Sequence, residues 1–230
     1  MPKPYGCRGL ILINYFKNTL YGFVLIGFNS SFAGSYEDFF SAIQRDDAAA
    51  VQQLLNRGFD PNTIDAKGNI GLLLAIREPS LKVAQVLAAS PRIELNSLSA
   101  QGESPLMMAA LKGQLALAEV LIKKGADVNK TGWTPLHYAA TSGQLPMIRL
   151  LLENYAYIDA ESPNGSTPLM MAGMYGTPDA VRLLIEEGAD PMLKNQQGLT
   201  AQQFAQRGNR LDSVEMLLKA VRSKQSPGKW

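Results

Sequence analysis

The sequence has one cysteine and one histidine among its 230 residues. Cys7 lies near the start, so the rest of the chain has no thiol for a disulfide framework or a catalytic cysteine. A single His137 excludes a metal site built from several histidines. Phosphate-binding loops of the G-x-x-x-x-G-K-[ST] or G-x-G-x-x-G type are also missing from the sequence. Stability is therefore expected to come from packing, and we expect no metal and no cofactor.

Acidic residues are missing from the first 36 positions, which carry Lys3, Arg8 and Lys17. Without these three, the 22 Lys and Arg fall to 19 against 20 Asp and Glu, a balance of −1. Proteins that bind nucleic acids draw their affinity from clustered basic residues that face phosphates. The near-neutral remainder of the chain therefore argues against a nucleic acid as partner.

Residues 1–33 have the three parts of a secretory signal peptide. A basic stretch through Lys17 precedes an uncharged run over 19–28, and small residues stand three and one positions before the end of the segment. This pattern predicts cleavage after Ala33 and export to the periplasm or out of the cell, with transient membrane contact. The alternative is a membrane anchor over 10–28, but polar residues interrupt it, and a span needs about 20 mostly apolar residues.

A phrase based on Thr-Pro-Leu recurs along the rest of the chain as SPLMMAA, TPLHYAA and TPLMMAG. Positions equivalent to its first residue recur at intervals of 33, 34, 30, 33 and 33 residues, at Glu37, Ile70, Ser104, Thr134, Thr167 and Thr200. A period near 33 is typical of stacked supersecondary units, because one helix pair cannot bury its apolar side alone. We predict six such units over 34–221, followed by a disordered tail over 222–230 that lacks the periodicity.

Each unit contains the signals of two short helices. The hydroxyl of Thr134 can cap a helix N-terminus, and Pro135 suits the first helical position because its missing N–H would have no partner there. Alanines and leucines at helical spacing give the buried stripe. A glycine such as Gly125 or Gly188 then ends the second helix in the left-handed conformation.

The period, the TPLHYAA phrase and closings such as KKGADVN together resemble the ankyrin repeat. The resemblance implies an all-α repeat fold, an ankyrin-type solenoid of about six helix-turn-helix units with hairpin fingers that project from one edge. It also implies a concave face, formed by fingers and first helices, that binds other proteins. With its signal peptide, the chain resembles exported ankyrin proteins of bacteria.

Three units depart from the pattern. Tyr155 replaces the closing glycine, and we expect Asn154 to take the left-handed conformation instead. The interval of 30 residues predicts a short finger over 129–132. In the last unit, Gln202 and Gln203 replace apolar residues, which predicts a cap with a polar outer side.

Catalysis is not expected from the residues present. Met107 and Met170 occupy the slot of His137 in the flanking units, so this slot is expected to be a buried helix start. The resemblance implies a structural role for this histidine, bonded to backbone between neighbouring fingers. The Met pairs at 107–108 and 170–171 are expected to fill the core. An enzyme that uses carboxylates or Lys remains an alternative, and it predicts a deep pocket holding a carboxylate of raised pKa.

The repeat also predicts which residues face a partner on the concave face. They are the finger residue before each anchor and the two residues after the alanines of each first helix: Asn69, Arg77, Glu78, Glu103, Leu111, Lys112, Trp133, Thr141, Ser142, Ser166, Met174, Tyr175 and Leu199. Leu111, Trp133, Met174 and Tyr175 form an apolar and aromatic group, the composition of a binding hot spot. We expect a monomeric, non-catalytic module that binds an unidentified protein partner, or alternatively a structural or protective accessory of another exported protein.

Overall fold

A computed structural model describes residues 34–225. The predicted signal peptide over 1–33, its cleavage site and residues 226–230 lie outside the described residues. Helices follow one another in pairs. The first pair joins the helix of residues 34–44 to α2 (Ala48–Asn56), and the others are α3 (Gly71–Arg77) with α4 (Leu81–Ala89), α5 (Pro105–Lys112) with α6 (Leu115–Lys123), α7 (Pro135–Ser142) with α8 (Leu145–Glu153), α9 (Pro168–Tyr175) with α10 (Pro178–Glu186), and α11 (Ala201–Arg207) with α12 (Leu211–Gln225).

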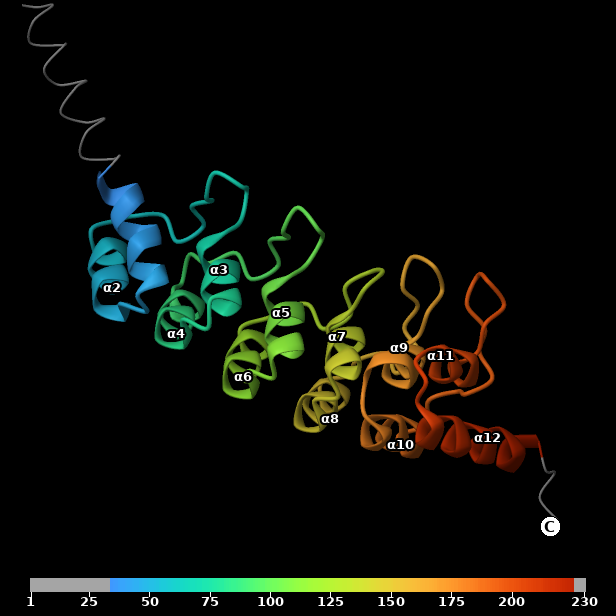
Figure 1. Cartoon of the computed structure of the whole chain (residues 1–230). Helices are drawn as coiled ribbons and strands as arrows, with labels where there is room; N and C mark the ends of the chain where they lie inside the picture. Colours follow the sequence, from blue (N-terminus) through green and yellow to red (C-terminus); the bar gives the residue numbers. More distant parts are fainter. Residues whose placement is uncertain (1–33, 226–230) are drawn as a thin grey trace, which may run out of the picture.

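The helix pairs stack into an elongated solenoid (Figure 1). The first helices α3, α5, α7, α9 and α11 form one row, and the second helices form another row beside it. The loops that connect successive units project beyond the row of first helices as fingers. The all-α solenoid of six helix pairs confirms the fold expected from the repeat.

The helix starts follow from local chemistry. The hydroxyls of Ser104, Thr134 and Thr167 each accept the backbone N–H three residues on, and a proline follows each of them. Gly113 and Gly143 end the first helices α5 and α7 with φ of 67° and 68°, where a residue with a Cβ is strained. These caps set both ends of α5 and α7 and the start of α9.

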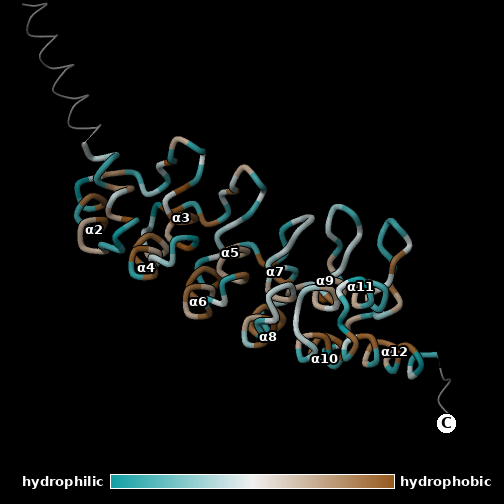
Figure 2. Tube along the Cα trace, viewed as in Figure 1, coloured by the Kyte–Doolittle hydropathy of each residue, from teal (hydrophilic) through white to brown (hydrophobic). Residues whose placement is uncertain are grey.

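One continuous core runs through the stack. The leucine that follows each Thr-Pro or Ser-Pro is fully buried, as are the alanines at helical spacing after it; examples are Leu106, Leu136, Leu169 and Ala139. Hydrophobic colouring gathers on the sides of the helices that face one another (Figure 2). Because these side chains are covered partly by the neighbouring unit, one unit alone would expose them.

Side-chain amides clamp successive units together at the turn after each second helix. Oδ1 of Asn129 accepts the N–H of Tyr157 at 2.8 Å, and its Nδ2 donates to the carbonyl of Tyr155 at 2.8 Å. At three other turns a side-chain oxygen likewise accepts a backbone N–H of the next unit: Asn62 from Glu94, Asn96 from Asp127, and Asp159 from Asp190. These clamps fix the rotation between neighbouring units.

Four fingers are closed by a backbone hydrogen bond between their first and last residues. The N–H of the first residue donates to the carbonyl of the last at 2.9 to 3.0 Å, in Asp65–Asn69, Ser99–Glu103, Ser162–Ser166 and Asn195–Leu199. Within residues 34–225 the fingers contain no strand, and the bridge between Ile64 and Ile70 is isolated. The finger after Asn129 has three residues fewer and no such closing bond among the described residues.

Two expectations about the chain are wrong. Asn154 has φ of −101°, and Tyr155 itself is left-handed with φ of 63°. The hydrogen bonds from Tyr155 N to Leu152 O and from Ala156 N to Leu151 O fix this conformation, whichever residue occupies the position. The tail does not begin at 222, because α12 continues to Gln225.

The extra length of α12 has a sequence cause. Val221 stands where Gly188 ends α10, so nothing stops the helix at that point. Nζ of Lys224 then lies 3.1 Å from Oδ1 of Asp190, which ties the last turn of α12 to the preceding unit.

Candidate partner-binding surface

His137 is part of the framework of the stack. Its side chain is buried, its Nε2 lies 2.9 Å from the carbonyl oxygen of Ser166, and its Nδ1 lies 3.2 Å from the backbone N of Thr134. These partners fit a neutral ring that donates from Nε2 and accepts at Nδ1. Burial lowers the pKa of His137 from 6.5 to about 4, although hydrogen bonds with the backbone of Ser166 and Ala160 act in the opposite direction. The ring thus joins one unit to the finger of the next.

Ser166 does not face a partner, contrary to the prediction. It is 1% exposed, and its hydroxyl has no hydrogen-bond partner within the described residues. Its N–H is bonded to the Ser162 hydroxyl, and its carbonyl accepts both the closing bond of the finger and the His137 ring. These bonds turn the last finger residue inward. Asn69, at the equivalent position, is also buried.

Trp133 is half-buried rather than fully presented on the surface. Its ring meets the His137 ring edge to face, with centroids 5.2 Å apart and an interplanar angle of 77°. Part of the indole therefore supports the helix start of its own unit. The remainder borders the concave face.

Arg77 and Glu103 form an ion pair between two neighbouring units. A nitrogen of the Arg77 guanidinium lies 2.5 Å from a Glu103 carboxylate oxygen, and the other terminal nitrogen donates to Oδ1 of Asn69 at 3.0 Å. Ser99 donates to the same carboxylate at 3.2 Å. Burial raises the pKa of Tyr138, and the charge of Glu103 adds to this while Arg77 opposes it. Arg77 and Glu103, which were both predicted to contact a partner, are thus paired with each other across two units.

The predicted residues of α7 and α9 present little charge. The hydroxyls of Thr141 and Ser142 donate to carbonyls of their own helix, at 2.7 Å to His137 and 3.0 Å to Tyr138. Tyr175 at the end of α9 is 51% exposed, and Met174 beside it is half-buried. In α5, Leu111 is half-buried and Lys112 is exposed.

Sequence reasoning missed a row of apolar residues on the first helices. The residue after the His137 slot is apolar in five successive units, as Leu74, Met108, Tyr138, Met171 and Phe204. Met107, Met108 and Met170 are buried, as the core-filling expectation requires, whereas Met171 is half-buried. The sequence contained the signal for this row, because the apolar position recurs at the period of the repeat. In α9, the second methionine of the pair, Met171, therefore borders the surface.

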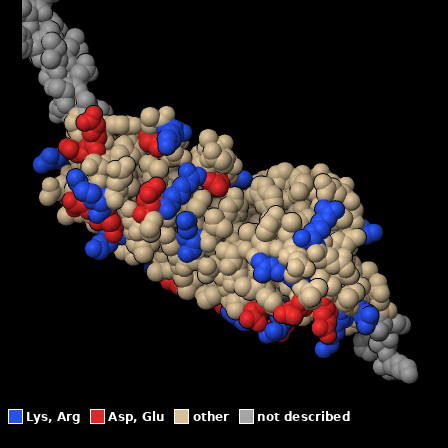
Figure 3. Space-filling model, viewed as in Figure 1, with Lys and Arg blue, Asp and Glu red and all other residues tan. Residues whose placement is uncertain are grey.

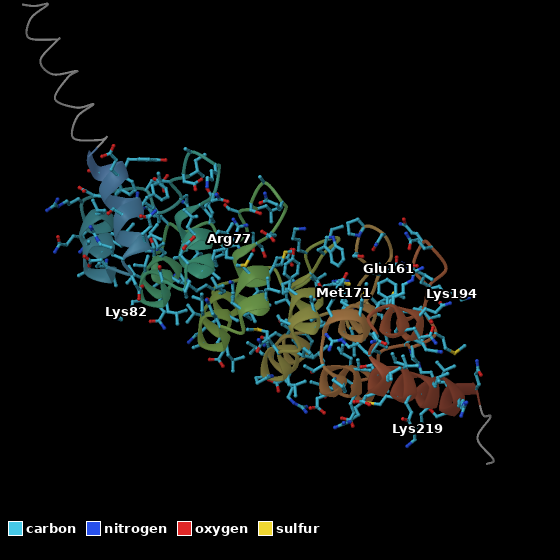
Figure 4. The ribbon with its side chains drawn as sticks, in the orientation of Figure 1. Arg77, Lys82, Glu161, Met171, Lys194 and Lys219 are labelled. Atoms are coloured by element: carbon cyan, nitrogen blue, oxygen red, sulfur yellow. The ribbon has the colours of Figure 1, made fainter. Side chains whose placement is uncertain are left out.

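We call Tyr138, Thr141, Ser142, Met171, Met174 and Tyr175 the uncharged surface. It lies on α7 and α9, whereas Arg77, Glu78, Glu103 and Lys112 lie on units closer to the N-terminus. In the space-filling view, acidic and basic side chains gather around the position of Arg77, which Figure 4 labels (Figures 3 and 4). Figure 4 also labels two exposed charged residues, Glu161 and Lys194, beside the fingers before α9 and α11. The named residues of α7 and α9 are thus uncharged, whereas those of the preceding units include two acidic and two basic side chains.

Asp159, an acidic residue of raised pKa, has a structural role. Burial raises the pKa of Asp159, but both of its carboxylate oxygens accept the N–H of Asp190, at 3.1 and 3.2 Å, as part of a clamp between units. Over residues 34–225, no three His, Cys, Asp or Glu side chains come together in a way that could hold a metal ion. In the same range, no helix combines the length and apolarity needed to cross a membrane.

A family model of ankyrin repeats (three copies) matches the chain at 39–131, 72–162 and 157–226. The chain therefore belongs to the ankyrin repeat family. Ankyrin repeats are generally modules of protein–protein interaction, and their fold is typically non-catalytic.

Three similar proteins illustrate the range of this family. The rat ankyrin repeat and SAM domain-containing protein 6 is 28% identical over 109 residues, which are 46% of this chain and 12% of that protein. The ankyrin repeat domain of human ASB11 is 26% identical with a TM-score of 0.71, over 79% of this chain and 82% of that one. A chain from the complex of the predatory endopeptidase Bd0816 of Bdellovibrio bacteriovorus with immunity protein Bd3460 is 29% identical with a TM-score of 0.68, over 79% and 97%.

Proposed function

We propose that this chain is a non-catalytic binding module that docks one protein partner on its concave face, acting as a monomer outside the cytoplasm. The uncharged surface carries the proposal. It presents two tyrosines and two methionines, and aromatic side chains are enriched at binding hot spots while Met adapts to the shape of a partner. The rigid helices α7 and α9 hold these side chains in place, which lowers the entropic cost of binding.

The capture experiment compares two pairs of surface residues. Replacing Met174 and Tyr175 together by Ala should weaken capture of the partner by about 2 kcal/mol, roughly 30-fold. The matched control replaces Tyr155 and Tyr157 by Ala. These tyrosines are 85% and 68% exposed, but they belong to the turn after α8 and not to a finger or first helix.

Photo-crosslinking identifies the partner before affinities are measured. A benzophenone amino acid at position 174 should give one discrete crosslinked product with a protein of the native extract, and the same probe at position 155 should not. The product then supplies the partner for the alanine comparison. Equal loss of affinity in both alanine pairs, or crosslinking from position 155 alone, would move the binding site away from the concave face.

A second candidate function is protection or inhibition of another exported protein. The similarity to a chain of the Bd0816–Bd3460 complex favours it, because one member of that complex is an immunity protein. Under this function, the crosslinked partner is an enzyme whose activity falls when the purified chain is added in equal amounts. A partner with no measurable activity change leaves the binding module as the simpler function.

Export is tested on the chain produced in its native cell. The proposal expects a soluble protein outside the cytoplasm whose first residue is Gly34, determined by N-terminal sequencing. Recovery of the intact chain from the membrane fraction would instead favour the anchor.

A further inference from the structure

A hollow of about 280 Å³ lies at the N-terminal end of the concave face. The helix of 34–44 and α3 form its walls, and the first finger forms its rim, with Phe40, Ile43, Gln44, Asp65, Lys67, Leu74 and Glu78 as its lining. This volume is just below that of pockets for small molecules, and it suits one long side chain.

The floor of the hollow is apolar and partly aromatic. Phe40 and Leu74 are half-buried, and Ile43 is 1% exposed. The Phe40 ring is held edge to face by Tyr36, with centroids 4.8 Å apart, so its orientation is fixed. A floor of this kind binds methylene groups, and the face of an aromatic ring also attracts a cation.

The rim carries one unbalanced negative charge. Burial acts to raise the pKa of Asp65, but hydrogen bonds from Asn69 and from the backbone N–H of Lys67, together with the Lys67 charge, lower it overall. Glu78 is exposed, and its carboxylate has no ion-pair or hydrogen-bond partner within residues 34–225. It directly follows α3, whose carbonyl end adds partial negative charge.

Arg77, the nearest basic residue in sequence, does not neutralise Glu78. Its guanidinium is bonded to Glu103 and Asn69. The Glu78 carboxylate is therefore available to a cation of a partner.

We propose that this hollow binds a basic side chain, Arg or Lys, of the protein partner, with its methylene stem on Phe40, Ile43 and Leu74 and its cation beside Glu78. The inference rests on the proposed binding function and adds the chemistry of one anchor residue. The partner would thus place a basic residue at the N-terminal end of the concave face and uncharged residues on the uncharged surface.

The test uses small probes, so it does not need the native partner. N-acetyl-arginine amide is titrated into the isotope-labelled full chain, and amide chemical shifts are followed by NMR. Saturable changes are expected at positions 40, 43, 44, 74 and 78, with weak affinity because the probe is small. N-acetyl-citrulline amide has nearly the same shape without the charge, and it should bind about fivefold more weakly.

Matched variants separate the charge from the shape of the hollow. Glu78→Gln should weaken the arginine probe about fivefold and leave the citrulline probe unchanged. Glu119→Gln changes another exposed carboxylate, on α6, and should alter neither. Equal binding of the two probes by the unmodified chain, or no saturable change in the hollow, would overturn the proposal. Neither result depends on the alanine test at Met174 and Tyr175, so the two proposals can fail separately.

Discussion

Nε2 of His137 lies 2.9 Å from the carbonyl oxygen of Ser166, so a ring on α7 is bonded to the finger that precedes α9. The flanking units use Met107 and Met170 at this slot, whose sulfur atoms lie 3.3 and 3.4 Å from the backbone N of the capping residue. Methionine can therefore cap the helix start, but it cannot donate to the next finger. The histidine therefore adds a bond from the unit whose own finger is short to the full-length finger of the next unit.

This bond predicts a pH dependence of stability. The pKa of His137 is about 4 in the fold and 6.5 in the unfolded chain, so the unfolded chain binds more protons between these values. The contribution of the neutral ring to the free energy of unfolding is complete above pH 6.5. It is lost as the pH falls toward 4, because the unfolded chain takes up the proton first. The loss should reach about 3 kcal/mol of the free energy of unfolding.

The variant His137→Met provides the control, measured by urea unfolding from pH 7 to pH 4. It should cost about 1–2 kcal/mol at pH 7, because the buried Ser166 carbonyl loses one of its two donors. The extra fall in stability between pH 6.5 and 4 should disappear. An unchanged fall in this variant would assign the pH dependence to carboxylates instead.

A second prediction concerns the clamp between the unit of α7 and α8 and the unit of α9 and α10. Asn129 both accepts and donates in its clamp, whereas the carboxylate of Asp159 can only accept in the equivalent one. Burial also raises the pKa of Asp159, because it disfavours the charged carboxylate in the folded chain. Asp159→Asn should therefore stabilise the chain at pH 7 by about 1 kcal/mol, measured by urea unfolding. The reverse exchange, Asn129→Asp, should destabilise it by a similar amount. A loss of stability in Asp159→Asn would show that the carboxylate itself is required.

A third prediction concerns Tyr155, which is left-handed and 85% exposed. Tyr155→Gly should raise the free energy of unfolding by about 1 kcal/mol, because glycine takes this conformation without steric cost. Thermal unfolding provides the measurement. A decrease would mean that the tyrosine ring makes a stabilising contact that outweighs the backbone strain.

A fourth prediction concerns Gly176, at the end of α9. A Cβ at this position would overlap the carbonyl oxygen of Ala140 in the preceding unit and lie 2.9 Å from that of Ala172. Gly176→Ala should cost more than about 2 kcal/mol, because neither backbone can move without disturbing the stack. Gly188→Ala is the comparison, with φ of 102° and open space around the new Cβ, and it should cost about 1 kcal/mol. Equal costs would mean that the stack adjusts to the overlap.

Sequence reasoning predicted the features that depend on near neighbours in the chain. Thr134 and Pro135 specify a helix start because the hydroxyl and the fixed φ act within one turn. The period of the repeat likewise predicted the stack. The prediction of the left-handed residue after α8 was wrong by one position. The hydrogen bonds that end the helix require this conformation at Tyr155 and not at Asn154.

The binding surface was predicted less well, because exposure depends on the neighbouring unit. Ser166 was expected to face a partner and is instead buried beneath bonds from its own finger and from His137. Arg77 and Glu103 were expected to be available and are paired with each other. Met171 was expected to lie in the core and is half-buried. The bond from His137 to Ser166 and the ion pair of Arg77 with Glu103 each join residues that lie more than 20 positions apart in the sequence.

The sequence by itself determined the repeat, the caps and the apolar stripes, since these arise from interactions within a few residues of the chain. Only the tertiary structure decided which polar groups satisfy one another across units and which side chains remain open to a partner. The physical reason is the rotation between stacked units, fixed by clamps such as Asn129 on Tyr157. That rotation brings Phe40, Leu74 and Glu78 around one hollow, although they are up to 38 residues apart in the sequence.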